Sequence, residues 1–161
     1  MDILISEDLE SPAIQNLGEK YQLLRGAELW KDPAKLKEAI HNVRAILIRN
    51  QTQLTADILA EANQLLAIGR AGVGLDNIDI EEATERGIVV ISPLNANVTS
   101  VAEMTLGLMI SLARNIPQAN NSTKKGEWDR SGFTGIELER KVLAICGFGR
   151  IGRLVAKRAR A

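Results

Sequence analysis

Short apolar runs alternate with segments of helical periodicity over the first hundred residues. Several of these runs are apolar throughout, as expected for strands covered on both faces of a parallel sheet. We predict strands over residues 2–6, 21–25, 45–49, 65–69 and 88–92. Helix-like segments separate them, and this alternation predicts an α/β fold with an open parallel sheet and helices on both faces.

Helix-start signals precede each of the intervening segments. The dipeptides Ser11–Pro12 and Asp32–Pro33 each place a capping side chain directly before a proline of the first turn. Thr55 begins the third predicted helix, and Asp79 begins the fourth, which Gly87 ends. The capping residues therefore support the alternation that the apolar runs suggest.

The pattern changes near residue 97, where we place a domain boundary between residues 1–97 and 98–161. Beyond it, one long helix is predicted to begin at Ser100 as its cap and to run to about residue 115. Apolar residues circle most of this helix, so we expect it to be buried on several sides. The polar segment 120–135 is predicted to be a linker.

Composition excludes several classes of partner. Lys and Arg total 20 and Asp and Glu total 20, so no large field of one sign is present to attract nucleic acid or a membrane surface. No apolar run approaches the roughly 20 residues of a membrane span, and the start lacks the basic residues of a signal peptide. We therefore expect a cytoplasmic protein without a metal site, and a buried, unreactive thiol at Cys146.

A glycine loop follows the apolar run 142–146, which we predict to be a strand. Gly147 would allow the tight turn, Gly149 would let the backbone approach a pyrophosphate, and Gly152 would let the next helix pack closely. The pyrophosphate would then lie on the amides of the helix start. The alternative is a tight β–α turn that binds nothing. The acidic residue that binds ribose about 20 positions later in this fingerprint is absent, which predicts a weak half-site.

Arginines follow two neighbouring predicted strands, Arg49 after the third and Arg70 after the fourth. The carboxyl ends of parallel strands meet at one edge, and a guanidinium beside the glycine turn of Gly72 and Gly74 suits a carboxylate or a phosphate. The alternatives are solvated or ion-paired arginines and glycines that serve the turn alone. His41, the only histidine, lies within a predicted helix and is expected to be a solvated surface residue rather than a proton acceptor.

The stretch 68–119, "IGRAGVGLDN…NIPQA", together with "CGFGRIGR" at 146–153, resembles the NAD-dependent D-2-hydroxyacid dehydrogenases, and most of all their branch that oxidises 3-phosphoglycerate. The resemblance covers the whole chain. It implies a flavodoxin-like substrate domain over residues 1–97, which a later C-terminal segment would complete. It also implies that the long helix crosses into a Rossmann cofactor domain and helps to form a homodimer.

The resemblance also implies roles for individual residues. Arg49 and Arg70 match positions that hold the substrate's phosphate, and Asn97 matches a polar residue near the substrate. Val73 stands where similar proteins often carry a hydroxyl, which puts one cofactor hydrogen bond in question. The implied substrate site is Arg49, Arg70, Gly72, Gly74 and Asn97, and the implied NAD site is Val73, Gly147, Gly149, Arg150, Ile151 and Gly152.

By this resemblance the parent enzyme would oxidise 3-phosphoglycerate, a small phosphorylated hydroxy acid, with NAD at the entry to serine biosynthesis. The family's catalytic arginine, glutamate and histidine lie later in the cofactor domain and have no counterpart here, so no catalytic residue is assigned. We expect the front half of a dehydrogenase, inactive alone. Two alternatives stay open: a standalone flavodoxin-like binding or dimerisation module, and another D-2-hydroxyacid dehydrogenase. The choice between NAD and NADP also stays open.

Overall fold

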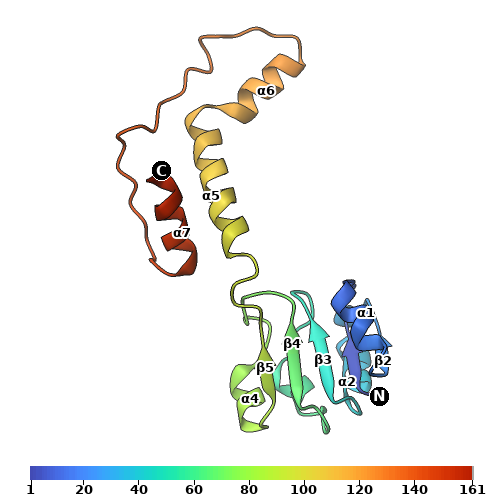
Figure 1. The fold of residues 1–161 in the computed structure, drawn as a ribbon. Coiled ribbons are helices and arrows are strands. Elements are labelled where there is room, and N and C mark those ends of the chain that lie inside the picture. The colour runs from blue at the N-terminus through green and yellow to red at the C-terminus, as the bar shows by residue number, and fades with distance from the viewer. Residues whose placement is uncertain (161) are drawn as a thin grey trace. The chain divides into compact units, whose positions relative to one another are not determined.

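The computed structural model describes residues 1–160, which fall into two compact units, residues 1–96 and residues 97–160. Each unit has its own set of elements (Figure 1). The first contains a β-sheet, and the described part of the second is helical apart from its connecting segments. The two are therefore described separately.

The first unit is built on a five-stranded parallel sheet in the order β2-β1-β3-β4-β5 (Figure 1). All five predicted strands form, each somewhat shorter than its apolar run: β1 (Ile3–Ile5), β2 (Leu23–Arg25), β3 (Ala45–Ile48), β4 (Ala67–Arg70) and β5 (Val89–Ile91). Ile48 at the end of β3 is aligned with Arg70 at the end of β4. This register brings the carboxyl ends of the two central strands level with each other.

The predicted helices of this unit form as α1 (Pro12–Gly18), α2 (Pro33–Ile40), α3 (Ala56–Leu59) and α4 (Ile80–Glu85), with a short 3-10 helix, η1 (Leu29–Lys31). Side chains cap three of them: Ser11 accepts from the Ile14 amide, Asp32 from the amides of α2's first turn, and Asp79 from the Glu82 amide. Thr55 precedes α3 but makes no cap bond. Gly87 ends α4 in the left-handed region, at φ 69°.

One face of the sheet carries most of the core. Leu4, Ile46 and Ile68 lie in register across β1, β3 and β4 and are fully buried. They pack in one cluster with buried residues of α2, α3 and α4, among them Leu36, Ile40, Leu59 and Ala83. The other face is covered less, since α1 buries no residue and Val89 and Ile91 of β5 are 58% and 59% exposed.

The second unit begins with α5 (Val98–Ala113), which starts earlier than predicted. Asn97 occupies its N-cap position without a side-chain cap bond, so Ser100 lies inside the first turn and the predicted cap at Ser100 is wrong. The expected burial on several sides is wrong as well, because Met104 and Leu108 are 63% and 62% exposed. Within residues 97–160, α6 (Ile116–Lys124) and α7 (Arg150–Ala159) pack against α5, and the Ile136 amide donates to the carbonyl of Ala113 at its end at 2.8 Å. Much of the apolar surface of α5 stays exposed.

Two further predictions for this unit need correction. Residues 120–124 belong to α6 rather than to a linker, because Asn115 turns the chain at φ 53° and Pro117 then starts a new helix whose polar residues need no core. The run 142–146 forms no strand, and Cys146 is exposed rather than buried. A strand needs a neighbour to bond its backbone, and the described residues of this unit offer none.

Candidate functional site

Arg49 and Arg70 lie at the same rim of the first unit, as the alternation of strands predicts. Arg70 is the last residue of β4 and is aligned with Ile48, the last residue of β3. Arg49 directly follows Ile48. Arg49 is exposed and Arg70 is half-buried. Among residues 1–160 neither guanidinium takes part in an ion pair. Both charges are therefore available to an anionic ligand.

The Arg70 side chain lies close to Gly72 in the glycine turn that follows β4. The Gly72 amide donates to the Arg70 carbonyl at 2.8 Å. A Cβ added to Gly72 would come within 2.2 Å of Arg70 Nη1, so a side chain there would make the Arg70 guanidinium move from its present place. A Cβ on Gly74 would come within 2.7 Å of Asp76 Oδ1. Any side chain at these two positions would displace a charged neighbour.

Arg70 also carries a donor without a partner. Its Nε is buried, and no atom of residues 1–160 accepts a hydrogen bond from it. An unsatisfied buried donor costs roughly 1–3 kcal/mol, which the acceptor oxygens of a ligand would relieve. Buried polar groups without partners are uncommon in folded proteins, and this one lies at the carboxyl end of a parallel strand, where ligands of open α/β sheets bind.

Glu7 holds the backbone of the segment that follows β3, and this residue was not identified from the sequence. It lies two residues after the end of β1, and the residue is only 4% exposed. Its Oε1 accepts from the backbone amides of Arg49 at 2.8 Å and Thr52 at 3.0 Å, and both carboxylate oxygens lie 3.2 Å from the amide of Gln51. The position held a signal, because Glu7 follows the first apolar run just as Arg49 follows the third.

The charge of Glu7 is stabilised by these bonds. Burial by itself raises the pKa of Glu7, but the donors of Thr52, Arg49 and Gln51 together hold the pKa below its ordinary value of 4.5. The carboxylate is therefore ionised at neutral pH. Its charge is shared with backbone N–H groups and not with either arginine.

Asn77 joins the same network from the loop after β4. Its side-chain amide donates to the carbonyls of Arg49 at 3.1 Å and Thr52 at 2.7 Å. The hydroxyls of Ser6 and Thr52 are 2.8 Å apart and buried. The segment 49–52 is thus held by the end of β1 on one side and by the loop after β4 on the other.

The glycine loop of the second unit has the backbone that its pattern predicts. Gly147 has φ 91°, which a residue with a Cβ rarely adopts. A Cβ on Gly152 would lie 2.2 Å from the Gly147 carbonyl oxygen, so α7 packs tightly on the turn. Nothing lies within 4 Å of the space that a Cβ on Gly149 would occupy. The open space at Gly149 fits the approach of a diphosphate.

The remaining predicted cofactor residues lie around the start of α7 or in the first unit. Arg150 is exposed and Ile151 is 38% exposed, and no side chain caps the helix at Gly149. Val73 is partly buried and brings no hydrogen-bonding side chain to the turn. Asn97 is exposed at the start of α5. A helix start without a side-chain cap, as at Gly149, is a type of site that suits an anion.

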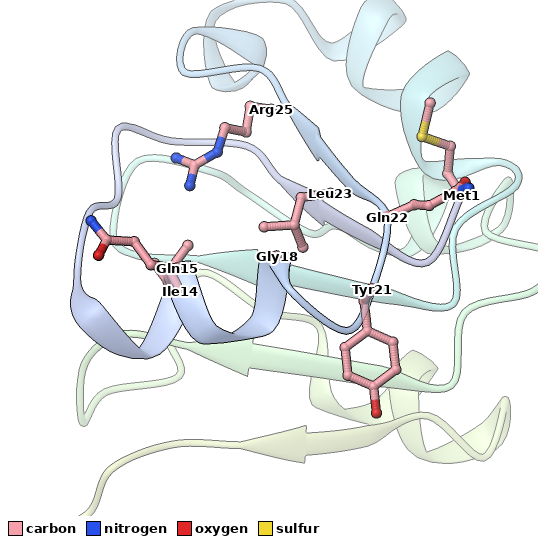
Figure 2. A pocket seen from close by; sticks show the side chains of 8 residues that line it. All are labelled: Met1, Ile14, Gln15, Gly18, Tyr21, Gln22, Leu23 and Arg25. Atoms are coloured by element: carbon pink, nitrogen blue, oxygen red, sulfur yellow. The ribbon is translucent and has the colours of Figure 1, made fainter.

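A separate hollow of about 730 Å³ lies beside α1 and the edge strand β2 (Figure 2). Its lining includes Met1, Tyr21, Leu23 and Arg25, and Arg25 is the only charged side chain among the lining residues. Arg25 is already paired with Glu10 at 2.6 Å. The hollow therefore lacks the available charge that distinguishes the rim of β3 and β4.

Other classes of site find little support in the described chain. His41 is exposed as predicted, and its Nδ1 lies 3.1 Å from the carbonyl oxygen of Glu61. Residues 1–160 contain no group of three potential metal-ligating side chains. Over the same residues, no helix is both long enough and apolar enough to span a membrane.

Comparison with known proteins places these features in a family. Residues 3–155 match the model of the D-isomer specific 2-hydroxyacid dehydrogenase catalytic domain. The chain is 48% identical over 159 residues to D-3-phosphoglycerate dehydrogenase of Methanocaldococcus jannaschii and 42% identical to that of Bacillus subtilis. Each alignment covers 99% of this chain. The chain spans about 30% of the length of these relatives.

Solved structures agree on the fold. D-lactate dehydrogenase from Aquifex aeolicus, solved with NAD and lactic acid, is similar at a TM-score of 0.87 and 25% identity. A glyoxylate reductase from Paecilomyes thermophila is similar at a TM-score of 0.83 and 27% identity. Each comparison covers 99% of this chain and about half of the solved one, at 48% and 52%.

Proposed function

The chain belongs to the D-isomer specific 2-hydroxyacid dehydrogenase family, and we propose that it carries the substrate-anion site and the diphosphate loop of an enzyme that oxidises 3-phosphoglycerate with NAD in serine biosynthesis. The observation that carries the proposal is the pair Arg49 and Arg70. Their strands are adjacent, neither has an acidic partner within residues 1–160, and the buried Nε of Arg70 lacks an acceptor. Relatives named D-3-phosphoglycerate dehydrogenase at 42–48% identity support the choice of substrate.

In this proposal the two guanidinium groups bind the ligand's phosphate. A planar guanidinium offers paired donors that match phosphate oxygens, and one donor of Arg70, its Nε, is already desolvated. Arg49 is exposed and supplies a second positive charge at the rim. The backbone of residues 72–74 would face the rest of the ligand, since its glycines leave the main chain uncovered.

The loop Gly147–Gly152 would hold the diphosphate of a nicotinamide cofactor. Gly147 sets the turn, Gly149 leaves room for the phosphates, and Arg150 and Ile151 lie at the start of α7, beside the place proposed for the diphosphate. The nicotinamide would supply the hydride acceptor for the substrate's hydroxyl carbon. Among the described residues we identify no proton acceptor at the rim. His41 does not serve as one, because it is hydrogen-bonded to the backbone of the loop after α3. We therefore expect the 161-residue chain to be inactive alone.

Calorimetric titration of the chain with D-3-phosphoglycerate, D-glycerate and NAD tests the proposal. We expect the phosphorylated acid to bind more tightly than D-glycerate, which has no phosphate. Arg49→Ala should weaken its binding by about 1.5–3 kcal/mol, roughly ten- to a hundredfold. Arg44→Ala is the matched control, because Arg44 is exposed and precedes β3, at the opposite end of that strand. Equal affinity for both acids, or an unchanged affinity in Arg49→Ala, would exclude the phosphate assignment.

A second candidate, a non-catalytic dimerisation module, is favoured by one observation. Met104, Leu108 and Leu112 of α5 are 63%, 62% and 78% exposed, an apolar surface that a second copy of the chain could cover. Homodimer formation through α5 is also compatible with the enzyme. Sedimentation velocity distinguishes the states, and a monomer across the micromolar range would exclude the dimerisation role.

A further inference from the structure

We propose that Glu7 is a positioning residue for Arg49, and that its buried carboxylate sets the place from which Arg49 binds a phosphorylated ligand. The proposal rests on the proposed function and adds to it a residue outside the predicted site. The Glu7 side chain is itself assigned no contact with the ligand. It acts through the segment 49–52, whose backbone it holds.

Backbone donors of one loop converge on the Glu7 carboxylate. Three backbone amides of one short loop, those of Arg49, Gln51 and Thr52, point at a single carboxylate that is only 4% exposed. A loop turns its amides inward in this way only around an acceptor. A carboxylate offers about four lone-pair positions and no hydrogen, so it can satisfy all three donors at once. An amide side chain in its place would present its own N–H groups to them.

The charge of the Glu7 carboxylate is kept apart from the guanidinium groups of the two arginines. The negative charge at Glu7 is shared with backbone N–H groups, and no ion pair joins it to Arg49 or Arg70. An acidic residue that bonded the guanidinium itself would compete with an anionic ligand. Glu7 instead fixes the main chain at position 49 and leaves the side-chain charge of Arg49 available. This arrangement separates the task of holding the loop from the task of binding the anion.

Hydrogen bonds link the segment after β3, which carries Arg49, to the loop after β4, which follows Arg70. Asn77, in the loop that follows Arg70, donates to the carbonyl of Arg49, while Glu7 accepts from the amide of the same residue. The peptide groups on both sides of the Arg49 Cα are therefore fixed, one by each partner. The main chain at Arg49 is thus held by hydrogen bonds to Glu7 and Asn77 and not by its exposed side chain.

A double-mutant cycle tests the role. D-3-phosphoglycerate affinity is measured by calorimetry for the wild-type chain, Glu7→Gln, Arg49→Ala and the double variant. We expect Glu7→Gln to weaken binding roughly tenfold alone and to have less than a twofold further effect when Arg49 is already alanine. Asp8→Asn, which removes a neighbouring exposed carboxylate, should change affinity less than twofold. An equal effect of Glu7→Gln in both backgrounds would show general loosening and overturn the proposal.

Amide hydrogen exchange provides an arm that needs no ligand. Glu7→Gln should speed exchange at Arg49, Gln51 and Thr52 while leaving the amides of β4 unchanged, and unchanged exchange at the three amides overturns the role of Glu7. A wild-type chain that binds no D-3-phosphoglycerate overturns the proposed function instead, so the two failures are distinguishable. If Glu7→Gln does not fold, Glu7→Asp replaces it in both arms, because the shorter carboxylate keeps the charge but cannot reach all three amides.

Discussion

The two units of this chain bury their apolar side chains to different extents. In the first unit, the sheet face formed by Leu4, Ile46 and Ile68 is covered by α2, α3 and α4, and its core residues are almost completely buried. In the second unit, the most apolar helix, α5, has Leu108 and Leu112 exposed. Helices form in both, because their hydrogen bonds are local. The comparison of the two units shows that a helix can form without its apolar side chains being buried.

The largest expected difference concerns matched leucines on helices. Leu36→Ala in α2 removes a side chain that is 2% exposed, and it should lower the free energy of unfolding by about 2–5 kcal/mol. Leu108→Ala in α5, at a site 62% exposed, should change it by less than about 0.5 kcal/mol. Urea denaturation followed by circular dichroism measures both. Similar losses would mean that α5 is covered in solution by another molecule.

Acid should weaken the first unit through Glu7. Because the folded-state pKa of Glu7 lies below 4.5, its stabilisation is fully present above that pH and is lost as the pH falls through the lowered pKa. At pH 7 we expect Glu7→Gln to cost about 1.5–3 kcal/mol. The gap between wild type and variant should narrow below pH 4.5 in parallel urea denaturations. A gap that stays constant from pH 7 to pH 3 would contradict a lowered pKa of Glu7 in the folded state.

Two glycines in the left-handed region allow a third comparison. Gly87 ends α4 at φ 69° and Gly147 turns the loop before α7 at φ 91°, and a Cβ would meet no atom within 4 Å at either position. Alanine at either site therefore pays only the backbone strain, about 1–2 kcal/mol. We expect Gly87→Ala to lower the thermal midpoint of the first unit. Gly147→Ala should leave that midpoint unchanged and instead weaken NAD binding in calorimetry; the opposite pattern would break the distinction between the units.

The smallest effects are expected at helix caps. Ser11 accepts from the Ile14 amide at 3.2 Å, so Ser11→Ala should destabilise the first unit by about 0.5–1 kcal/mol. Asn97 stands at the N-cap of α5 without a cap bond, and Asn97→Ala should change stability by less than about 0.5 kcal/mol. Chemical denaturation of both variants gives the comparison. A clear loss of stability in Asn97→Ala would point to a structural role instead of the proposed ligand contact.

Much of the candidate site was predictable because it depends on strand ends. Arg49 and Arg70 follow apolar runs directly, and parallel strands bring their carboxyl ends to one rim. The backbone of Gly147 was predictable from its place in the glycine pattern. Glu7 and Asn77 were not identified, because their role comes from bonds to residues 25 to 45 positions away, Arg49 and Thr52.

The amino-acid sequence by itself determined the order of strands and helices in the first unit, its capping residues, and the turn at Gly147. These features depend on local patterns: apolar periodicity, side chains that cap nearby amides, and a backbone angle open to glycine. Tertiary structure alone decided that 142–146 forms no strand, that Arg70 lies over Gly72, and that Glu7 holds the loop of Arg49. Each of these depends on which distant segment is present to bond or to cover a group, and no local pattern contains that information.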